Sequence, residues 1–224
     1  MNLKNIATIV IILWYTTTSF SQWNIIDGIS GQWQPLTSIN TSISRYNTLH
    51  PELIKPLSPM HLSPSLDFGV SYTRFSLSNE VIYHYSLQSS NGLSVLQGNG
   101  GSKKIKLTHT VHSISWMIHS NFQKWAVGTG IQYGRIVYEW KNETQNNRPP
   151  PYLTGLNQWW MRADIRYRLF NTGYLNVSLS PFFNYPIQSY STEAITDALG
   201  VQPTASEKEF IYGISLFFAN GPQE

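Results

Sequence analysis

The stretch from Trp159 to Leu169 reads WWMRADIRYRL, and its apolar and polar side chains alternate along the chain. Apolar residues occupy odd positions such as Met161 and Ile165, whereas three arginines and one aspartate occupy the even positions 162–168. Because successive side chains of a β-strand point to opposite faces, a period of two predicts a strand. We therefore expect a strand with one apolar face and one charged face.

The same alternation recurs along most of the chain. In the segment 104–119 it changes parity between Val111 and Ile114, which predicts a β-bulge. The prediction of the first strand, at 36–46, depends mainly on Ile39 and Ile43. In all, the pattern predicts eight strands, at about residues 36–46, 65–77, 79–88, 104–119, 124–141, 157–170, 173–185 and 208–218.

The predicted connections alternate between long and short, as in transmembrane β-barrels, which have long extracellular loops and short periplasmic turns. Most predicted strands are longer than the about 5–6 residues typical of soluble sheets, and they reach the about 9–11 residues that cross a bilayer. The sequence therefore predicts an all-β protein, an eight-stranded antiparallel up-and-down transmembrane β-barrel. Aromatic residues near strand ends, including Tyr138 and Trp140, are expected in belts at the membrane interfaces. The last long connection, 186–207, is expected to hold a helical turn around 193–199.

Composition narrows the function classes. Charged residues make up 12% of the 224 residues, about half the usual share, whereas aromatic residues make up 14% and argue against disorder. The chain has no cysteine, which excludes disulfides, thiolate metal sites and a cysteine nucleophile. A net charge of +3 is too small and too scattered to indicate nucleic-acid binding.

The first 21 residues have the features of a secretory signal peptide. Lys4 precedes an apolar run of ten residues, 6–15, and the small residues Ser19 and Ser21 stand before the expected cleavage site. The run is too short to cross a bilayer as a helix, which requires about 20 residues. We expect residues 1–21 to be the signal peptide and residues 22–224 to form a single exported barrel domain.

The chain resembles the small outer-membrane β-barrel superfamily, the group of OmpX and the transmembrane domain of OmpA. The resemblance covers about residues 22–218 and is one of pattern, carried by Ser19–Ser21 before Gln22 and by the strands LDFGVSY (66–72), VGTGIQYG (127–134) and YGISLFF (212–218). It implies an outer-membrane location, contact with outer-membrane lipid including lipopolysaccharide, and recognition by the barrel-insertion machinery. Family barrels commonly end on an aromatic residue; Phe218 fits, but six residues follow it.

An eight-stranded barrel is just wide enough to be filled by its own side chains. If the apolar faces meet lipid, the lumen receives a set of polar residues that must pair to offset the cost of burial. We expect this network to be structural, with a gated polar path or a small-ligand site as the functional alternative. Its predicted members are Asp67, Glu80, His84, Arg162, Asp164, Arg166 and Arg168.

Candidate enzyme sites are weaker. Lipid A deacylases of this barrel class use a histidine and a serine two residues apart, whereas His119 and Ser120 are adjacent and fall in a predicted turn. His109 and His112 are three residues apart and lie on opposite faces of a regular strand. Asp27 and Glu139 have no evident partner.

We therefore expect no catalytic residue, metal or cofactor. The extracellular loops are expected to serve a structural role or to bind a protein or polysaccharide. A lipid-modifying barrel enzyme and a soluble exported β-sandwich or lipocalin-like binding protein remain the alternatives.

Overall fold

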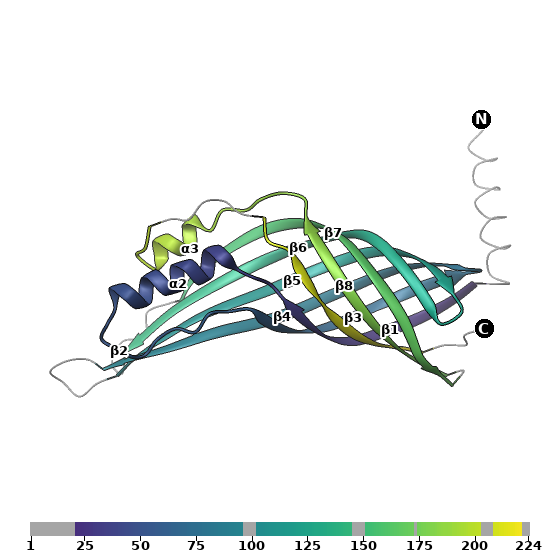
Figure 1. Ribbon diagram of the computed structural model, residues 1–224, viewed down its shortest axis with the longest axis horizontal. Coiled ribbons are helices and arrows are strands. Elements are labelled where there is room, and N and C mark those ends of the chain that lie inside the picture. The colour runs from purple at the N-terminus through teal and green to yellow at the C-terminus, as the bar shows by residue number, and fades with distance from the viewer. Residues whose placement is uncertain (1–20, 96–101, 145–150, 173, 203–207, 221–224) are drawn as a thin grey trace.

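Eight long antiparallel strands close into a barrel in the computed structural model, which describes residues 21–95, 102–144, 151–172, 174–202 and 208–220 (Figure 1). Each of the eight pairs with the next one along the chain, and the last pairs with the first. The prediction of an eight-stranded up-and-down barrel is thus confirmed. The strands are β1 (Ser21–Trp33), β3 (Leu62–Arg74), β4 (Leu77–Val95), β5 (Ser102–Phe122), β6 (Trp125–Thr144), β7 (Tyr152–Asn171), β8 (Leu175–Pro186) and β9 (Ile211–Asn220).

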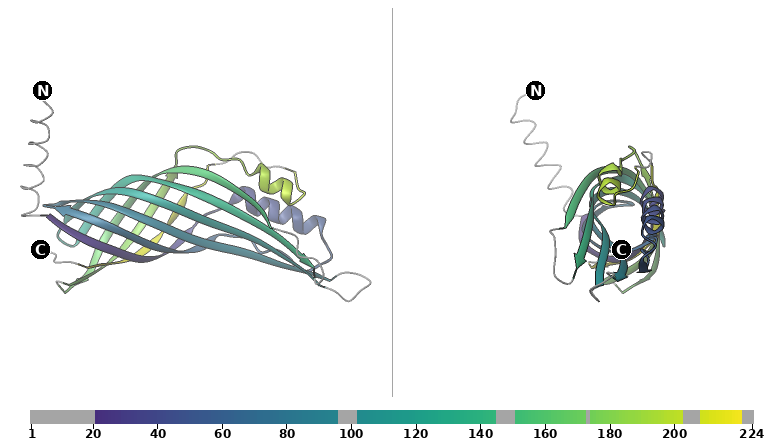
Figure 2. Two further views of the ribbon diagram at one scale, coloured as in Figure 1. Left: turned by 180° about the vertical axis from the view of Figure 1, so that it is seen from behind. Right: turned by 90° about the vertical axis from the view of Figure 1, so that its left-hand side faces the viewer.

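The two ends of the barrel differ. Short turns follow β3, β5 and β7 at one end, which we call the turn end, and both Ser21 and Asn220 lie there. Two of these turns need a residue in the left-handed region, Phe75 with φ 54° and Gln123 with φ 47°. The long connections lie at the opposite end, which we call the cap end because helices cover it (Figure 2).

The first predicted strand is wrong. Residues 36–46 belong to helix α2 (Thr37–Leu49), and the first strand of the ring is β1. Ile39, Ile43 and Tyr46 lie at i, i+4 and i+7, which places them on one buried face of a helix rather than on one face of a strand. The predicted signal peptide falls outside the described residues except for Ser21, which begins β1.

The predicted bulge in β5 is also wrong. β5 pairs with β4 and β6 in continuous register, and its odd-numbered residues point inward from Ile105 to His119. The sequence parity changes because the inner face is apolar near the cap end, at Leu107 and Val111, and polar near the turn end, at Ser113 and Ser115. Among the described strands of the ring, the register shift lies between β7 and β8, next to Arg168.

Strands β4 to β7 are 19 to 21 residues long, and their cap-end halves extend beyond the shorter strands (Figure 1). Helices α2 and α3 (Glu193–Ala198) lie against the inner face of this extension, and α3 falls at the helical turn expected around 193–199. The short strand β2 (Leu53–Lys55) pairs with β4.

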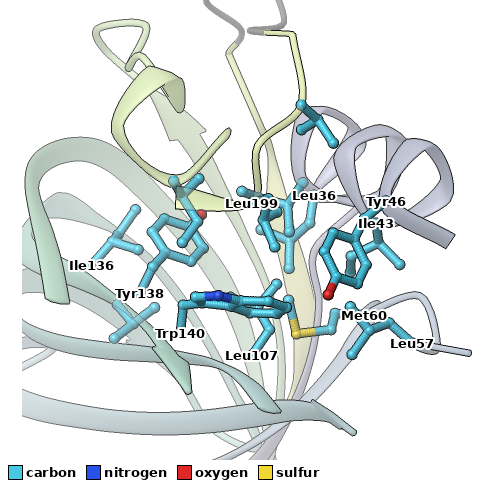
Figure 3. Packing of buried hydrophobic residues seen from close by; sticks show 14 of the residues in the cluster. Leu36, Ile43, Tyr46, Leu57, Met60, Leu107, Ile136, Tyr138, Trp140 and Leu199 are labelled. Carbon is cyan, nitrogen blue, oxygen red and sulfur yellow. The ribbon is translucent and has the colours of Figure 1, made fainter. Parts of the chain in front are cut away.

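A hydrophobic core fills the space between the helices and the extended strands (Figure 3). Tyr138 and Trp140 were expected in a membrane-interface belt, but both point inward and are 0% and 8% exposed. The ring of Tyr46 on α2 meets Trp140 edge-on at 5.2 Å between centroids. The core of this cap also includes Leu36, Ile39, Ile43, Leu57, Met60, Leu107, Ile136, Ile195 and Leu199.

Candidate functional site

The candidate site is a network of polar side chains inside the barrel, between the cap core and the turn end. All seven residues predicted for the lumen have inward-pointing side chains, and five of them are at most 4% exposed, whereas Arg166 and Arg168 are partly exposed. Four of the seven occupy even positions of the stretch 159–169 on β7: Arg162, Asp164, Arg166 and Arg168. The structure brings six of the seven into specific contacts and leaves Arg168 at the mouth of the lumen.

The strongest contact crosses the lumen. Arg166 donates two hydrogen bonds to the Glu80 carboxylate, at 2.8 and 2.9 Å, and such bidentate pairs are among the strong hydrogen bonds of proteins. The guanidinium group also lies 3.8 Å from Asp164 and 4.7 Å from the centroid of the Phe217 ring. The pair therefore links β7 to β4, two strands that are not neighbours in the ring.

Asp164 has a second partner that the sequence analysis missed. His119 Nε2 lies 2.8 Å from Asp164 Oδ1, and Ser180 donates to the other oxygen at 3.2 Å. His119 was assigned to a turn, but β5 continues to Phe122 and turns the side chain into the lumen, where it is 0% exposed. His119 could have been identified from the sequence, because it occupies an odd position and the odd-numbered residues of β5 point into the barrel.

Gly128 shows how closely these groups pack. A Cβ atom built on Gly128 would overlap both the His119 ring and the Asp164 carboxylate. The glycine-spaced stretch 127–134 of β6 therefore gives the neighbouring strands the space in which this ion pair forms.

A second cluster lies nearer the cap. Asp67 Oδ1 is 2.8 Å from His84 Nδ1, and His84 Nε2 is 2.8 Å from Ser115 Oγ. This order of contacts is that of a Ser-His-Asp triad. All three residues are at most 1% exposed, however, so the hydroxyl of Ser115 has no open path to a substrate in this conformation.

Arg162 contacts a set of neutral amides and an aromatic ring. It donates to Gln132 at 3.2 Å and stacks on the Phe182 ring at 4.2 Å. Gln132 donates in turn to Ser113, and Asn184 donates to Gln132. The charge of Arg162 is thus held by an amide oxygen and an aromatic face rather than by a direct ion pair.

Apolar side chains enclose the network on two sides. Trp160, Ile136, Val111 and Phe182 belong to the cap core, whereas Ile26, Ile82 and Phe217 form a small cluster nearer the turn end. The described residues contain no group of three or more histidine and acidic side chains that could hold a metal ion. The arrangement therefore fits a closed, internally paired lumen.

The outer face of the barrel carries an apolar belt between two rows of aromatic residues. Near the turn end, Trp23 pairs with Tyr72 and Trp125 with Tyr167, at 5.0 and 4.6 Å between centroids. Toward the cap end, Tyr133 pairs with Trp159 at 4.6 Å and Trp33 with Tyr212 at 6.4 Å. Trp23 and Trp33 are ten positions apart on β1, about 33 Å of strand, which at a tilt of about 40° corresponds to a height of about 25 Å, that of the apolar band of such barrels. Beyond the cap-side row polar side chains appear on the outer face, as at Arg135 and Lys141.

Two acidic residues, Glu139 and Asp27, lie outside the lumen network. Glu139 has a partner, Lys141, at 2.8 Å, contrary to the expectation that it has none. Asp27 is exposed on the outer face, opposite Phe68 and Phe218 on the adjoining strands, and none of the residues that the structure describes pairs with its carboxylate. Within the described ranges, no helix is long and apolar enough to span a membrane.

No protein-family model and no curated protein sequence matches the chain. Its structure is similar to that of Ail, the attachment invasion locus protein of Yersinia pestis, solved with the heparin analogue sucrose octasulfate (TM-score 0.41, 6% identity, 89% of this chain and 98% of Ail). It is also similar to the N-terminal β-barrel domain of Pseudomonas aeruginosa OprF (TM-score 0.37, 8%, 88% and 96%) and to the outer membrane protease OmpT of Escherichia coli (0.39, 6%, 89% and 95%).

Proposed function

We propose that this chain is a non-enzymatic integral protein of the bacterial outer membrane, with a lumen closed by its own side chains and a rigid helical cap on the extracellular side. The observation that carries the proposal is the outer face between the two aromatic rows. Its exposed residues are almost all large and apolar, for example Trp116 at 52% and Ile165 at 49%, although soluble proteins rarely expose large contiguous apolar patches. A bilayer removes this cost by covering the belt.

The alternation of connections supports the orientation. In transmembrane barrels the short turns face the periplasm and the long loops face outward. The turn end then lies in the periplasm, and the cap of α2, α3 and the extended strands stands outside the cell. This arrangement makes the cap the surface on which a protein or polysaccharide partner binds.

Basic residues just beyond the cap-side aromatic row support contact with anionic lipid. Arg135, Lys104 and Lys106 point outward on β5 and β6 and are exposed. In the proposed orientation they stand at the level of the outer-leaflet headgroups, where lipopolysaccharide carries phosphates. Their cationic side chains provide the attraction expected between a membrane protein and anionic headgroups.

Fractionation tests the location. We expect the protein in the outer-membrane fraction, with a gel mobility that changes when the sample is boiled, because folded barrels resist detergent. Recovery of the mature chain as soluble periplasmic protein would contradict the proposal. In planar bilayers we expect no stable ion-conducting pore, because buried ion pairs fill the lumen; steady single-channel currents would argue against the closed lumen.

The Ser115–His84–Asp67 contacts favour a hydrolase as the second candidate function. A fluorophosphonate probe distinguishes the two, because it labels an activated, accessible serine. We expect no labelling of Ser115 in the folded protein and an unchanged lipid A mass spectrum in a deletion strain. Labelling that is lost in Ser115→Ala would establish the hydrolase instead.

A further inference from the structure

A polar cavity of about 220 Å³ opens at the turn end of the lumen. It is lined by residues of all eight ring strands and by the β5–β6 turn, and Glu80 and Arg166 are among its lining residues. A water molecule takes up about 30 Å³ in the liquid, so the cavity has the volume of about seven waters. It is therefore large enough for a small ligand group and its hydration.

The cavity is strongly cationic. Lys124, Arg166 and Arg168 line it, and Glu80 is the one acidic residue among its lining residues. The Glu80 carboxylate is already occupied, since Arg166 donates to both of its oxygens. Two positive charges, those of Lys124 and Arg168, are left without an acidic partner among the described residues.

A backbone hydrogen bond joins Lys124 and Arg168. The Arg168 amide donates to the Lys124 carbonyl at 2.8 Å, which fixes the end of β7 against the β5–β6 turn. The register of β7 with β8 shifts just after Arg168, and bulges at barrel rims commonly redirect a side chain. Both side chains line the same cavity, so an anion bound there would offset their positive charges.

Further hydrogen-bonding groups around the cavity lack partners. Arg166 Nε is buried and unpaired among the described residues. Asn24 is 5% exposed; its Nδ2 donates weakly to Ser71, and its Oδ1 has no partner. Both unpaired atoms are closed off from the cavity, so the free cationic donors that line it are those of Lys124 and Arg168.

We propose that this cavity binds a small oxyanion group, a phosphate or a carboxylate, through Arg168 and Lys124. Guanidinium groups suit such ligands because their planar donors match two oxygens at once. The site lies on the opposite end of the barrel from the cap and does not require the lumen to open. In the orientation proposed above it faces the periplasm.

The test uses the full chain folded in zwitterionic detergent, so that binding is measured without a membrane and independently of the proposed location. Sodium phosphate and sodium acetate are titrated by calorimetry, with sodium chloride as the reference. We expect saturable binding of one or both oxyanions, and at least a tenfold loss of affinity in Arg168→Gln, in Lys124→Gln and in the double variant. The tighter of the two probes identifies the group that the site prefers.

The matched control is Lys55→Gln/Lys208→Gln, which removes the same charge from two exposed positions far from the turn end. It should bind as the wild type does. Absence of binding above the chloride reference, or an equal loss of affinity in the control, would overturn the proposal. Lys124 is exposed and Arg168 is half-exposed, so each single variant should fold, which the mobility shift on boiling verifies.

Discussion

Arg166 on β7 and Glu80 on β4 form a doubly hydrogen-bonded ion pair across the lumen, with N–O distances of 2.8 and 2.9 Å. Strands β5 and β6 lie between their two strands in the ring. The pair therefore holds opposite sides of the barrel together in a way that the backbone hydrogen bonds of neighbouring strands cannot. His119 and Asp164 extend it into a connected set of polar contacts.

Breaking this pair from one side should be costly. We expect Glu80→Gln to lower the free energy of unfolding by about 3–5 kcal/mol, because it leaves the Arg166 charge buried without its main partner. Urea unfolding in detergent micelles, followed by gel mobility, measures the change. Glu139→Gln is the matched control, since its pair with Lys141 is 26% and 35% exposed and such pairs contribute at most about 1 kcal/mol. Equal effects of the two variants would show that the lumen pair is not structural.

Substitution on the outer face tests the membrane belt. Ile165 points outward from β7 between the aromatic rows, and an arginine near the bilayer midplane costs about 2–4 kcal/mol. We expect Ile165→Arg to lower the free energy of unfolding in lipid vesicles by this amount. Val137→Arg, which lies on β6 beyond the cap-side row, should change it by less than about 1 kcal/mol. A small effect at position 165 would mean that this face does not meet lipid.

Asp27 is the exception on the belt, and its removal should stabilise the protein. It lies four residues beyond Trp23 on β1, between Ile25 and Ile29, with no described partner. A carboxylate facing lipid is unfavourable, although less so than a lysine or an arginine. We expect Asp27→Leu to raise the free energy of unfolding in vesicles by roughly 1 kcal/mol. In a detergent that keeps the residue hydrated, the free energy of unfolding should stay unchanged. Destabilisation in vesicles would indicate that the carboxylate has a partner in the membrane.

The cap should unfold separately from the barrel when its core is weakened. Ile43 on α2 is 1% exposed within the cap core, and shortening such a side chain costs about 2–5 kcal/mol. We expect Ile43→Ala to open α2 to proteases while the barrel keeps its mobility shift on boiling. Thr48→Ala, on the exposed side of the same helix, should leave cleavage unchanged. Loss of the whole barrel in Ile43→Ala would show that the cap and the barrel fold as one unit.

Seven of the eight ring strands could be predicted from the sequence because one face of each meets a uniform environment. In β7, for instance, the outer face is apolar and the inner face charged over most of the belt, so a simple alternation survives. The β-bulge predicted in β5 was wrong because the inner face of this strand meets two environments, the apolar cap and the polar lumen. The side-chain pattern changes there while the backbone register does not.

The helix α2 was mistaken for a strand because Ile39 and Ile43, four residues apart, lie on one face in either structure. Tyr46, at i+7 from Ile39, distinguishes the two, since only a helix places it with them. The triad-like contacts of Ser115, His84 and Asp67 could not be predicted, because they join three strands across distances of 17 to 48 residues along the chain. Which lumen residues pair depends on the register, which the alternation alone does not determine.

His109 makes the cap sensitive to acid. It lies on β5 on the cap side of the aromatic rows, is 0% exposed beside the Tyr138 ring, and neither ring nitrogen has a hydrogen-bond partner among the described residues. Burial lowers the pKa of His109 from 6.5 to about 4, because the apolar surroundings disfavour the charged ring. Burial also raises the pKa of Tyr138 and of Tyr190, which bonds to Glu209 at the same end, so both phenols stay neutral.

The unfolded cap therefore takes up a proton near pH 6.5, whereas the folded cap takes it up only near pH 4. The free energy of unfolding should be constant above about pH 7 and fall by about 3 kcal/mol as the pH drops to 4. Protease cleavage of the cap, measured at a series of pH values with an acid-tolerant enzyme, follows this change. His109→Leu should remove most of the pH dependence, because no proton is taken up at that position in either state. His112→Gln, on the exposed outer face three residues away, should keep it; an identical pH profile in His109→Leu and the wild type would assign the acid sensitivity to another group.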